Sequence, residues 1–188
     1  LINEEIQKGT GGRIIMKMNS LTDRDILDKL HEASDAGVRV DLIIRGICCL
    51  LPDAQGKTEN IRVTSIVGRY LEHSRVFCFG EGAQMKMYLS SADMMTRNTQ
   101  RRVEIACPVW DSDIKNRLYN GLQILLKDTK KARRLLSNGQ YVKKIHPDNL
   151  VLDAQQYFMG QAMKNAQEVS QQQTKKGFLE KWRGIFRK

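Results

Sequence analysis

The stretch RIIMKMNSLTDRDILDKLHEASDAGVRVDLII, residues 13–44, decides the fold of this chain. Its first part, residues 13–18, is rich in Ile and Met and predicts a strand. Apolar residues then recur at helical spacing over residues 23–36, with Thr22 as the expected N-cap. Residues 38–44 are again strand-like. Two strands joined through a helix form a β-α-β unit, so we expect them to lie parallel with a right-handed crossover.

Similar short patterns continue on the C-terminal side of this unit. Further runs with the composition of strands cover residues 61–67, 76–79, 85–89 and 103–109. Residues 111–127 place apolar side chains on one helical face, which predicts a second helix. The chain therefore has the pattern of an α/β protein in which a mixed, largely parallel β-sheet is flanked by helices.

The character of the chain changes near residue 147. Residues 149–173 favour a long helix with a Gln-rich end. We therefore divide the chain into a domain of residues 1–147 and a helical, basic C-terminal extension of residues 148–188. Within the extension, residues 178–188 combine Phe and Trp at helical spacing with Lys and Arg. That composition is typical of a helix that attaches weakly to anionic membranes, or of one that docks on another part of the protein.

The net charge indicates what kind of partner the chain binds, and the cysteine content indicates the compartment in which it works. The 188 residues carry a net charge of +10, and residues 127–188 alone hold 14 basic and 5 acidic groups. Such a field favours polyanions, including nucleic acid, anionic lipid and polyphosphate. The four cysteines show no C-x-x-C spacing, which indicates reduced thiols in a cytoplasmic protein. Because the chain does not begin with Met, we expect a further segment before Leu1.

Polar side chains gather where the predicted strands end or begin. They are Lys17, Asn19 and Ser20 after the first strand, Arg45 and Gly46 after the second, and Glu72, His73 and Arg75 before the fourth. Ligands collect at the carboxyl ends of parallel strands, so these groups are candidates for one site. The structural alternative is that each is a solvated charge or a hydrogen-bonded structural histidine.

Several long strings closely resemble the C-terminal domain of bacterial polyphosphate kinases, in matching order and spacing over residues 1–147. They are KMNSL (17–21), AGVRVDLIIRGICCL (36–50), ENIRVTSIVGRYLEHSRVFCF (59–79), YLSSADMMTRN (88–98) and RRVEIACPV (101–109). The resemblance implies a phospholipase D-like fold. It also marks departures from phospholipase D, whose His-x-Lys motif is His73-Ser74-Arg75 here, and from many family members, which have Trp where this chain has Met94.

The resemblance implies reversible transfer of the terminal phosphate of ATP to inorganic polyphosphate through a phosphohistidine in the preceding domain. Within the matching motifs, Arg45, His73 and Arg102 correspond to residues that contact the nucleotide phosphates. His73 is expected to assist as a general acid or base. The implied cofactor is ATP or ADP with Mg²⁺, for which this sequence identifies no metal ligand.

Secondary assignments concern neighbouring charges. Lys17, Arg69 and Arg97 are candidates to line a polyphosphate channel, with a role as salt-bridge partners equally open. Glu72 is expected to hold the His73 ring, or to pair with Arg75 or Arg69. By strand alternation, Arg102 and Glu104 are predicted to share one face, while Arg101 points away.

Two other functions remain open at this stage. One is a phosphodiesterase of the phospholipase D type, for which the chain has His73 but no His-x-Lys motif. The other is a stand-alone polyanion-binding module without catalysis. Nucleic acid is not an expected partner, because no aromatic stacking platform accompanies the charge. The expected partners are polyphosphate, ATP, the preceding domains, a second copy of the chain and, at the periphery, an anionic membrane.

Overall fold

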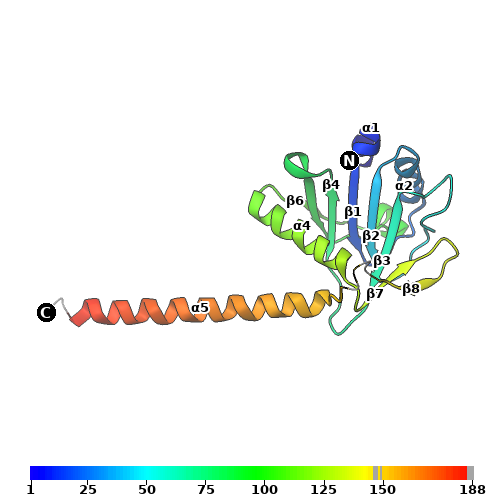
Figure 1. The fold of residues 1–188 in the computed structure, drawn as a ribbon. Coiled ribbons are helices and arrows are strands. Elements are labelled where there is room, and N and C mark those ends of the chain that lie inside the picture. Colours follow the sequence, from blue (N-terminus) through cyan, green and yellow to red (C-terminus); the bar gives the residue numbers. More distant parts are fainter. Residues whose placement is uncertain (146–147, 149, 186–188) are drawn as a thin grey trace.

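A computed structural model describes residues 1–145, 148 and 150–185, with side chains through Ser170. Its centre is one open, eight-stranded sheet in the order β6-β5-β4-β1-β2-β3-β7-β8 (Figure 1). The strands are β1 (Arg13–Met18), β2 (Arg39–Ile44), β3 (Ile61–Ile66), β4 (Arg75–Phe79), β5 (Lys86–Ser90), β6 (Ala106–Pro108), β7 (Ala132–Leu135) and β8 (Tyr141–Lys143). The short strands β7 and β8 were not expected from the sequence.

The sheet is mixed, as predicted, but its parallel part is small. Only β1 with β2 and β2 with β3 pair in parallel, and the five other pairs are antiparallel. The prediction of a largely parallel sheet was therefore wrong. The reason is the connection formed by residues 67–74, which links β3 to β4 without a helix. A parallel strand needs a longer crossover, about a dozen residues or more, so the chain enters β4 at the edge where β3 ended.

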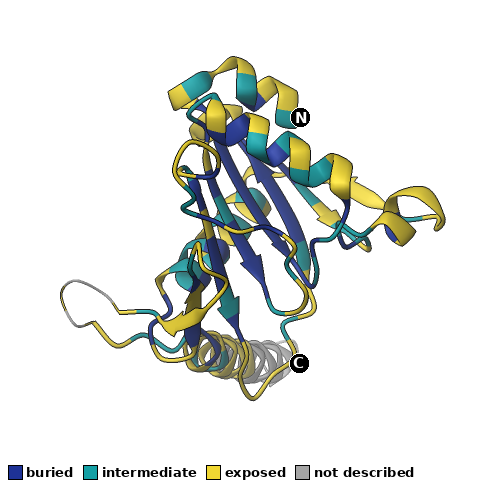
Figure 2. Ribbon diagram, turned by 90° about the vertical axis from the view of Figure 1, so that its right-hand side faces the viewer, coloured by how far each residue is buried: buried dark blue, intermediate teal, exposed yellow. Residues whose placement is uncertain are grey.

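Helices cover both faces of the sheet and form two apolar cores. The helices α1 (Ile2–Gln7) and α2 (Arg24–Asp35) pack on one face, and α4 (Ser112–Lys127) packs on the other. Every residue of β1 is buried between the two layers, and Figure 2 shows the buried residues concentrated along the central strands. The fully buried β1 thus gives a rigid support to the residues that follow it, beginning with Asn19.

Two helices begin at aspartate caps. The Asp23 side chain accepts a hydrogen bond from the Ile26 backbone N–H at 3.2 Å, so Asp23, and not the predicted Thr22, caps α2. In the same way Asp111 accepts from the Ile114 N–H at 2.8 Å at the start of α4. A carboxylate at this position also interacts favourably with the positive end of the helix dipole. The short α3 (Thr96–Gln100) and two 3-10 turns, Gly9–Gly11 and Gly82–Gln84, complete the helical elements.

The C-terminal helix α5 (Ala154–Ile185) projects away from the sheet (Figure 1). Within the described residues the helix continues to Ile185, into the segment of residues 178–188. The side chains of that segment, residues 178–188, lie outside the described part of the chain. None of the described helices is both long and apolar enough to cross a membrane.

Candidate functional site

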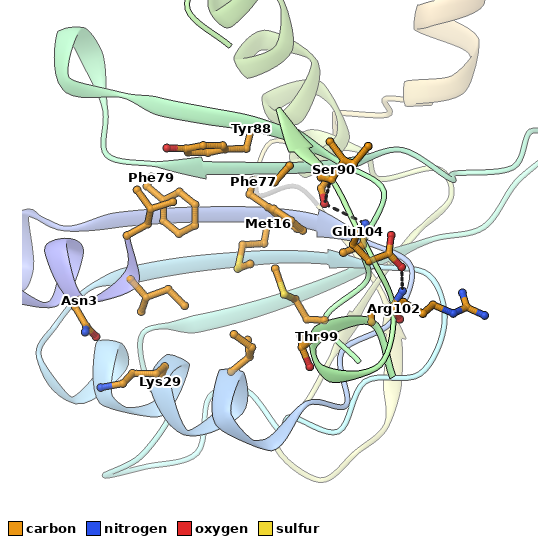
Figure 3. Close-up of a pocket in the computed structure, with 18 residues that line it drawn as sticks. Asn3, Met16, Lys29, Phe77, Phe79, Tyr88, Ser90, Thr99, Arg102 and Glu104 are labelled. Carbon is orange, nitrogen blue, oxygen red and sulfur yellow. Dashed lines mark hydrogen bonds between the residues drawn. The ribbon is translucent and has the colours of Figure 1, made fainter. Parts of the chain in front are cut away.

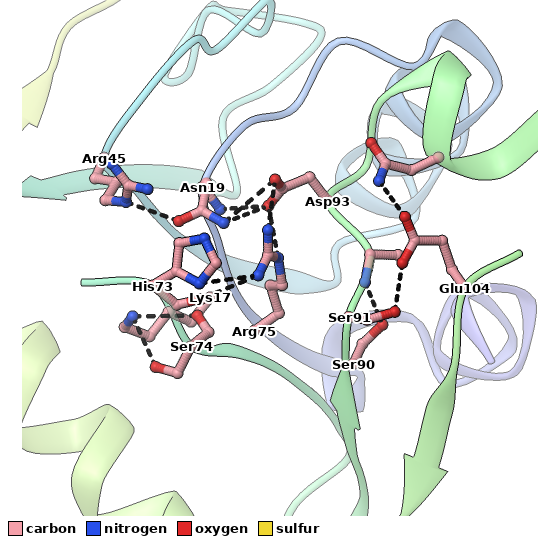
Figure 4. Close-up of polar contacts among 12 residues, drawn as sticks. Lys17, Asn19, Arg45, His73, Ser74, Arg75, Ser90, Ser91, Asp93 and Glu104 are labelled. Carbon is pink, nitrogen blue, oxygen red and sulfur yellow. Dashed lines mark hydrogen bonds and ion pairs between the residues drawn. The ribbon is translucent and has the colours of Figure 1, made fainter. Parts of the chain in front are cut away.

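A polar network occupies the edge of the sheet where β1 and β2 end (Figure 4). Lys17 and Asn19 stand at the end of β1, and Arg45 follows β2. His73 and Arg75 reach the same edge because β4 is antiparallel to β1 and begins where β1 ends. The antiparallel pairing of β4 with β1, which the sequence did not reveal, thus brings His73 to the same edge as Arg45.

Asp93, in the turn after β5, is the central acceptor of the network. Its side chain is nearly buried and accepts from the Asn19 backbone N–H at 2.7 Å. Its two oxygens also receive Nε and Nη2 of Arg75 at 3.2 and 3.1 Å. Burial opposes ionisation of this carboxyl, but the hydrogen bonds from Arg75 and Asn19 outweigh it and hold the pKa of Asp93 below its ordinary value. Asp93 is therefore a fixed negative charge.

Asn19 links this carboxylate to Arg45. The Asn19 Nδ2 donates to Asp93 at 3.0 Å, while its Oδ1 accepts from Nε of Arg45 at 2.7 Å. The carboxamide is satisfied only in this orientation, because a carboxylate accepts and a guanidinium donates. Asn19 therefore fixes the direction of the Arg45 side chain.

His73 is exposed, and Arg75 contacts its ring. The His73 Nδ1 lies 3.3 Å from Nη1 of Arg75. Because a guanidinium only donates hydrogen bonds, Nδ1 must accept, and the proton of the neutral ring belongs on Nε2. The ring therefore turns a protonated nitrogen away from Arg75. Arg45 and His73, two of the three predicted site residues, are in this way joined through Asn19, Asp93 and Arg75.

Lys17 and Glu72 form a second, buried part of the network. The Lys17 ammonium lies 3.2 Å from a Glu72 oxygen and donates to Oγ of Ser74 at 2.9 Å. Burial lowers the pKa of Lys17, while the Glu72 carboxylate works against that shift. The expectation that Glu72 holds the His73 ring, or pairs with Arg75 or Arg69, was wrong, since its partners are Lys17 and Gln155. Lys17 is buried and paired, which agrees with the alternative that it is a salt-bridge partner.

Arg102 is not brought into this network. It is exposed and lines an apolar groove of about 640 Å³ between α2, α3 and strands β4 and β5 (Figure 3). Beside it, Glu104 accepts from Nδ2 of Asn98 at 2.5 Å and from the Ser91 hydroxyl, and these bonds lower the pKa of Glu104. Residues 102–104 precede β6, so the prediction that Arg102 and Glu104 share one face of a strand was wrong.

The sequence missed the importance of two residues. In the sequence, Asp93 appears only within the string YLSSADMMTRN, and Asn19 only as a polar residue after the first predicted strand. Both residues have short side chains that can accept hydrogen bonds, and this is the signal in the sequence that could have pointed to them. Of the remaining candidates, Arg69 lies 5.9 Å from the Tyr70 ring centre, and Arg97 is exposed on α3.

Comparison with known proteins identifies the family. The sequence profile described as "Polyphosphate kinase C-terminal domain 2" matches residues 1–155. This chain belongs to that polyphosphate kinase family. A polyphosphate kinase from Staphylococcus epidermidis is 48% identical over 171 residues, which are 91% of this chain and 23% of the relative. One from Helicobacter pylori is 48% identical over 164 residues, covering 87% and 24%.

Solved structures support the same polyphosphate kinase assignment. The crystal structure of a polyphosphate kinase from Porphyromonas gingivalis superposes with a TM-score of 0.79 at 41% identity, covering 87% of this chain and 26% of that one. Nuc from Salmonella typhimurium, a phospholipase D family member, has a TM-score of 0.52 at 17% identity, covering 72% and 89%. The second likeness shows the fold alone. The predicted phospholipase D-like α/β fold is confirmed, and the chain spans about a quarter of the length of its kinase relatives.

Proposed function

We propose that this domain forms the phosphate-binding half of an active site that transfers the terminal phosphate of ATP reversibly to inorganic polyphosphate. The observation that supports this is the arrangement of Arg45, His73 and Arg75 at one sheet edge, held by a buried carboxylate. Phosphoryl transfer is catalysed mainly by positioning and by neutralising charge on phosphate oxygens. Fixed guanidinium groups beside an exposed imidazole suit that chemistry.

Arg45 is proposed to bind a nucleotide phosphate directly. Its Nε donates to Asn19, and among the described residues no hydrogen bond or ion pair engages its two terminal nitrogens. Those nitrogens form one edge of a planar fork that matches the spacing of phosphate oxygens. Arg102, whose guanidinium is exposed beside the groove, is proposed as a second phosphate contact approaching from the other side of the turn after β5.

His73 is proposed to assist the transfer and not to become phosphorylated. With Nδ1 facing Arg75, Nε2 carries the proton and can donate it to the oxygen that leaves phosphorus, or recover it in the reverse direction. The nucleophile is proposed to be a histidine of the preceding domain, which forms the phosphohistidine. His31, on α2, takes no part in the Asp93 network, and His146 lies outside the described residues.

Mg²⁺ is proposed to arrive with the nucleotide phosphates. The carboxylates nearest to the site are already engaged: Asp93 with Arg75, Glu72 with Lys17, and Glu104 with Ser91 and Asn98. Across the described residues, no group of three or more His, Cys, Asp or Glu is arranged to hold a metal ion. The domain's own residues therefore fit the phosphates better than they fit the metal.

Several further expectations stay part of this proposal. The partners are polyphosphate, ATP, the preceding domains and a second copy of the chain, and the location is the cytoplasm. All four cysteines are free, which agrees with a reducing compartment. The division at residue 147 and weak attachment of the basic tail to anionic membranes also remain proposals.

The proposal is tested by His73→Ala and His73→Gln in the full-length enzyme. Both variants should lower turnover in both directions across the neutral pH range, while ATP binding is retained. An unchanged rate would remove the acid-base role. The purified chain alone should bind polyphosphate in a salt-dependent manner without consuming ATP, and ATP turnover above that of an inactive control would show that the nucleophile lies within it.

A further inference from the structure

The carboxamide of Gln155 links the start of α5 to residues 67–74, the connection between β3 and β4 that carries His73. Gln155 is the second residue of α5 and is 6% exposed. Its Oε1 accepts from the Tyr70 backbone N–H at 3.1 Å, and its Nε2 donates to the Tyr70 carbonyl at 2.8 Å. The same Nε2 donates to Oε1 of Glu72 at 2.9 Å. One side chain thus makes three bonds to residues 70–72.

This contact continues to both sequence neighbours of His73. Glu72 gives one oxygen to Gln155 and the other to the Lys17 ammonium. Lys17 in turn donates to the Ser74 hydroxyl and, at 3.2 Å, to the Ser74 carbonyl. The residues on either side of His73, Glu72 and Ser74, are therefore held in place. The imidazole itself is exposed, and its partner in the network is Arg75.

Apolar packing does not replace these bonds. Val67 and Leu71, the aliphatic residues of the connection, are 68% and 71% exposed. Gly68 allows the close approach of Gln155, since a Cβ at that position would lie 2.5 Å from Oε1 of Gln155. Polar contacts from outside the connection thus determine its path.

The other side of Gln155 is firmly anchored. The Ala154 backbone N–H donates to Oδ2 of Asp128 at 2.7 Å, and Asp128 is fully buried. Thr129 exchanges hydrogen bonds with Leu152, accepting from its N–H through Oγ1 and donating its own N–H to the carbonyl. The first turn of α5 is therefore held by the segment between α4 and β7, and Gln155 projects from a fixed base.

We propose that Gln155 is a positioning residue for His73, acting through residues 70–72. The proposal rests on the proposed function of His73 and adds that the geometry of this imidazole is set by the start of the C-terminal helix. Small displacements of a catalytic group have large effects on rate, because the reacting atoms must be aligned. Loss of the carboxamide should therefore reduce turnover more than it reduces nucleotide binding.

The test uses Gln155→Met in the full-length enzyme, which keeps the length of the side chain and removes all three bonds. We expect kcat to fall about ten- to a hundredfold, with a much smaller change in KM for ATP. Gln156→Met is the matched control, because Gln156 is exposed on the next position of the same helix. Amide exchange of residues 67–74 should accelerate only in the Gln155 variant, since the Tyr70 N–H loses its acceptor.

Comparison with His73→Ala separates this inference from the proposed function. If Gln155 acts through His73, the double variant should be no slower than His73→Ala alone. If His73→Ala has no effect on turnover, the proposed acid-base role of His73 fails, and with it the role on which this inference rests. If His73→Ala is slow but Gln155→Met behaves like the control, or if the two losses multiply, the positioning role is overturned.

A second pair of substitutions covers the case in which Gln155→Met does not fold. Gln155→Glu keeps an acceptor for the Tyr70 backbone N–H, but it places a second carboxylate against that of Glu72. Because the two negative charges repel, turnover should fall. Combining Gln155→Glu with Glu72→Gln restores one hydrogen bond between the two side chains, with the amide at position 72 now donating to the carboxylate at position 155. Partial recovery of turnover and of slow exchange in residues 67–74 is expected, and no recovery of either would contradict the proposal.

Discussion

Two buried aspartates of this domain differ in what they bind. Asp128, between α4 and β7, is fully buried, and among the described residues its side chain accepts from three backbone N–H groups, those of Lys131, Ala132 and Ala154. Asp93 accepts mainly from side chains, the guanidinium of Arg75 and the carboxamide of Asn19, together with one backbone N–H. Asp128 joins elements of the fold, and Asp93 orients Arg75, which contacts the exposed ring of His73. The carboxylate of Asp93 therefore orients residues of the candidate site, whereas that of Asp128 holds elements of the fold together.

The largest effect is expected from Asp128→Ala. Three backbone donors would lose their acceptor in a dry environment, and an unsatisfied buried donor costs about 1–3 kcal/mol. The unfolding free energy, measured by denaturant titration, should fall by about 3 kcal/mol or more. Asp111→Ala, which removes an exposed helix cap, is the control and should cost about 1 kcal/mol. Equal losses would remove the distinction drawn for Asp128.

Asp93→Asn should reduce turnover strongly and stability less, the reverse of what is expected for Asp128→Ala. The side chain keeps its shape but loses the charge that pairs with Arg75, so the direction of Arg75 and of the His73 ring is no longer fixed. In the full-length enzyme, turnover should fall about a hundredfold, while the loss of stability stays below that of Asp128→Ala. A variant that is unstable yet fully active per folded molecule would place Asp93 in the same class as Asp128.

Arg45 and Arg102 test whether the Asp93 network is a unit. Each Ala substitution should weaken nucleotide use about ten- to a hundredfold, since hydrogen bonds to charged groups contribute about 1.5–3 kcal/mol. The effect of Arg45→Ala should shrink in an Asn19→Ala background, because Asn19 orients Arg45. The effect of Arg102→Ala should add independently. Independent effects for both arginines would contradict a connected network.

The smallest expected effect is a difference in acid stability. The pKa of folded Asp93 lies below its ordinary value of 3.8, so its contribution to stability is present above that pH and is lost as pH falls through the lowered pKa. From about pH 5 down to about pH 2, the unfolding free energy of the wild type should therefore decrease more steeply than that of Asp93→Asn. Parallel curves would mean that Asp93 is not held as an anion in the folded chain.

Much of the fold could be predicted because its signals are local. The helices α2 and α4 follow from apolar spacing and from aspartates that cap their first turns, and the error at Thr22 is a single position. The β-α-β unit follows from the order of its elements. The weak strands β7 and β8 escaped prediction because each is short and, in β7, two arginines interrupt the apolar pattern.

The site could be predicted only in part. Arg45 and His73 were found as basic or titratable residues next to predicted strands, and the structure joins them. Glu72 was assigned to the wrong partner, because strand alternation does not apply to residues 67–74, which follow no strand geometry. Gln155 gave no signal at all, since a glutamine in a Gln-rich helix looks like an exposed residue.

The sequence by itself determined the family, the two main helices, the central β-α-β unit and the residue types available for phosphate. Only the tertiary structure decided that β4 runs antiparallel to β1, that Asp93 and not Glu72 holds Arg75, and that the start of α5 meets the His73 connection. The physical reason is range. Periodicity and capping depend on residues within a few positions, whereas these contacts join residues far apart in the chain and depend on the order of strands in the sheet.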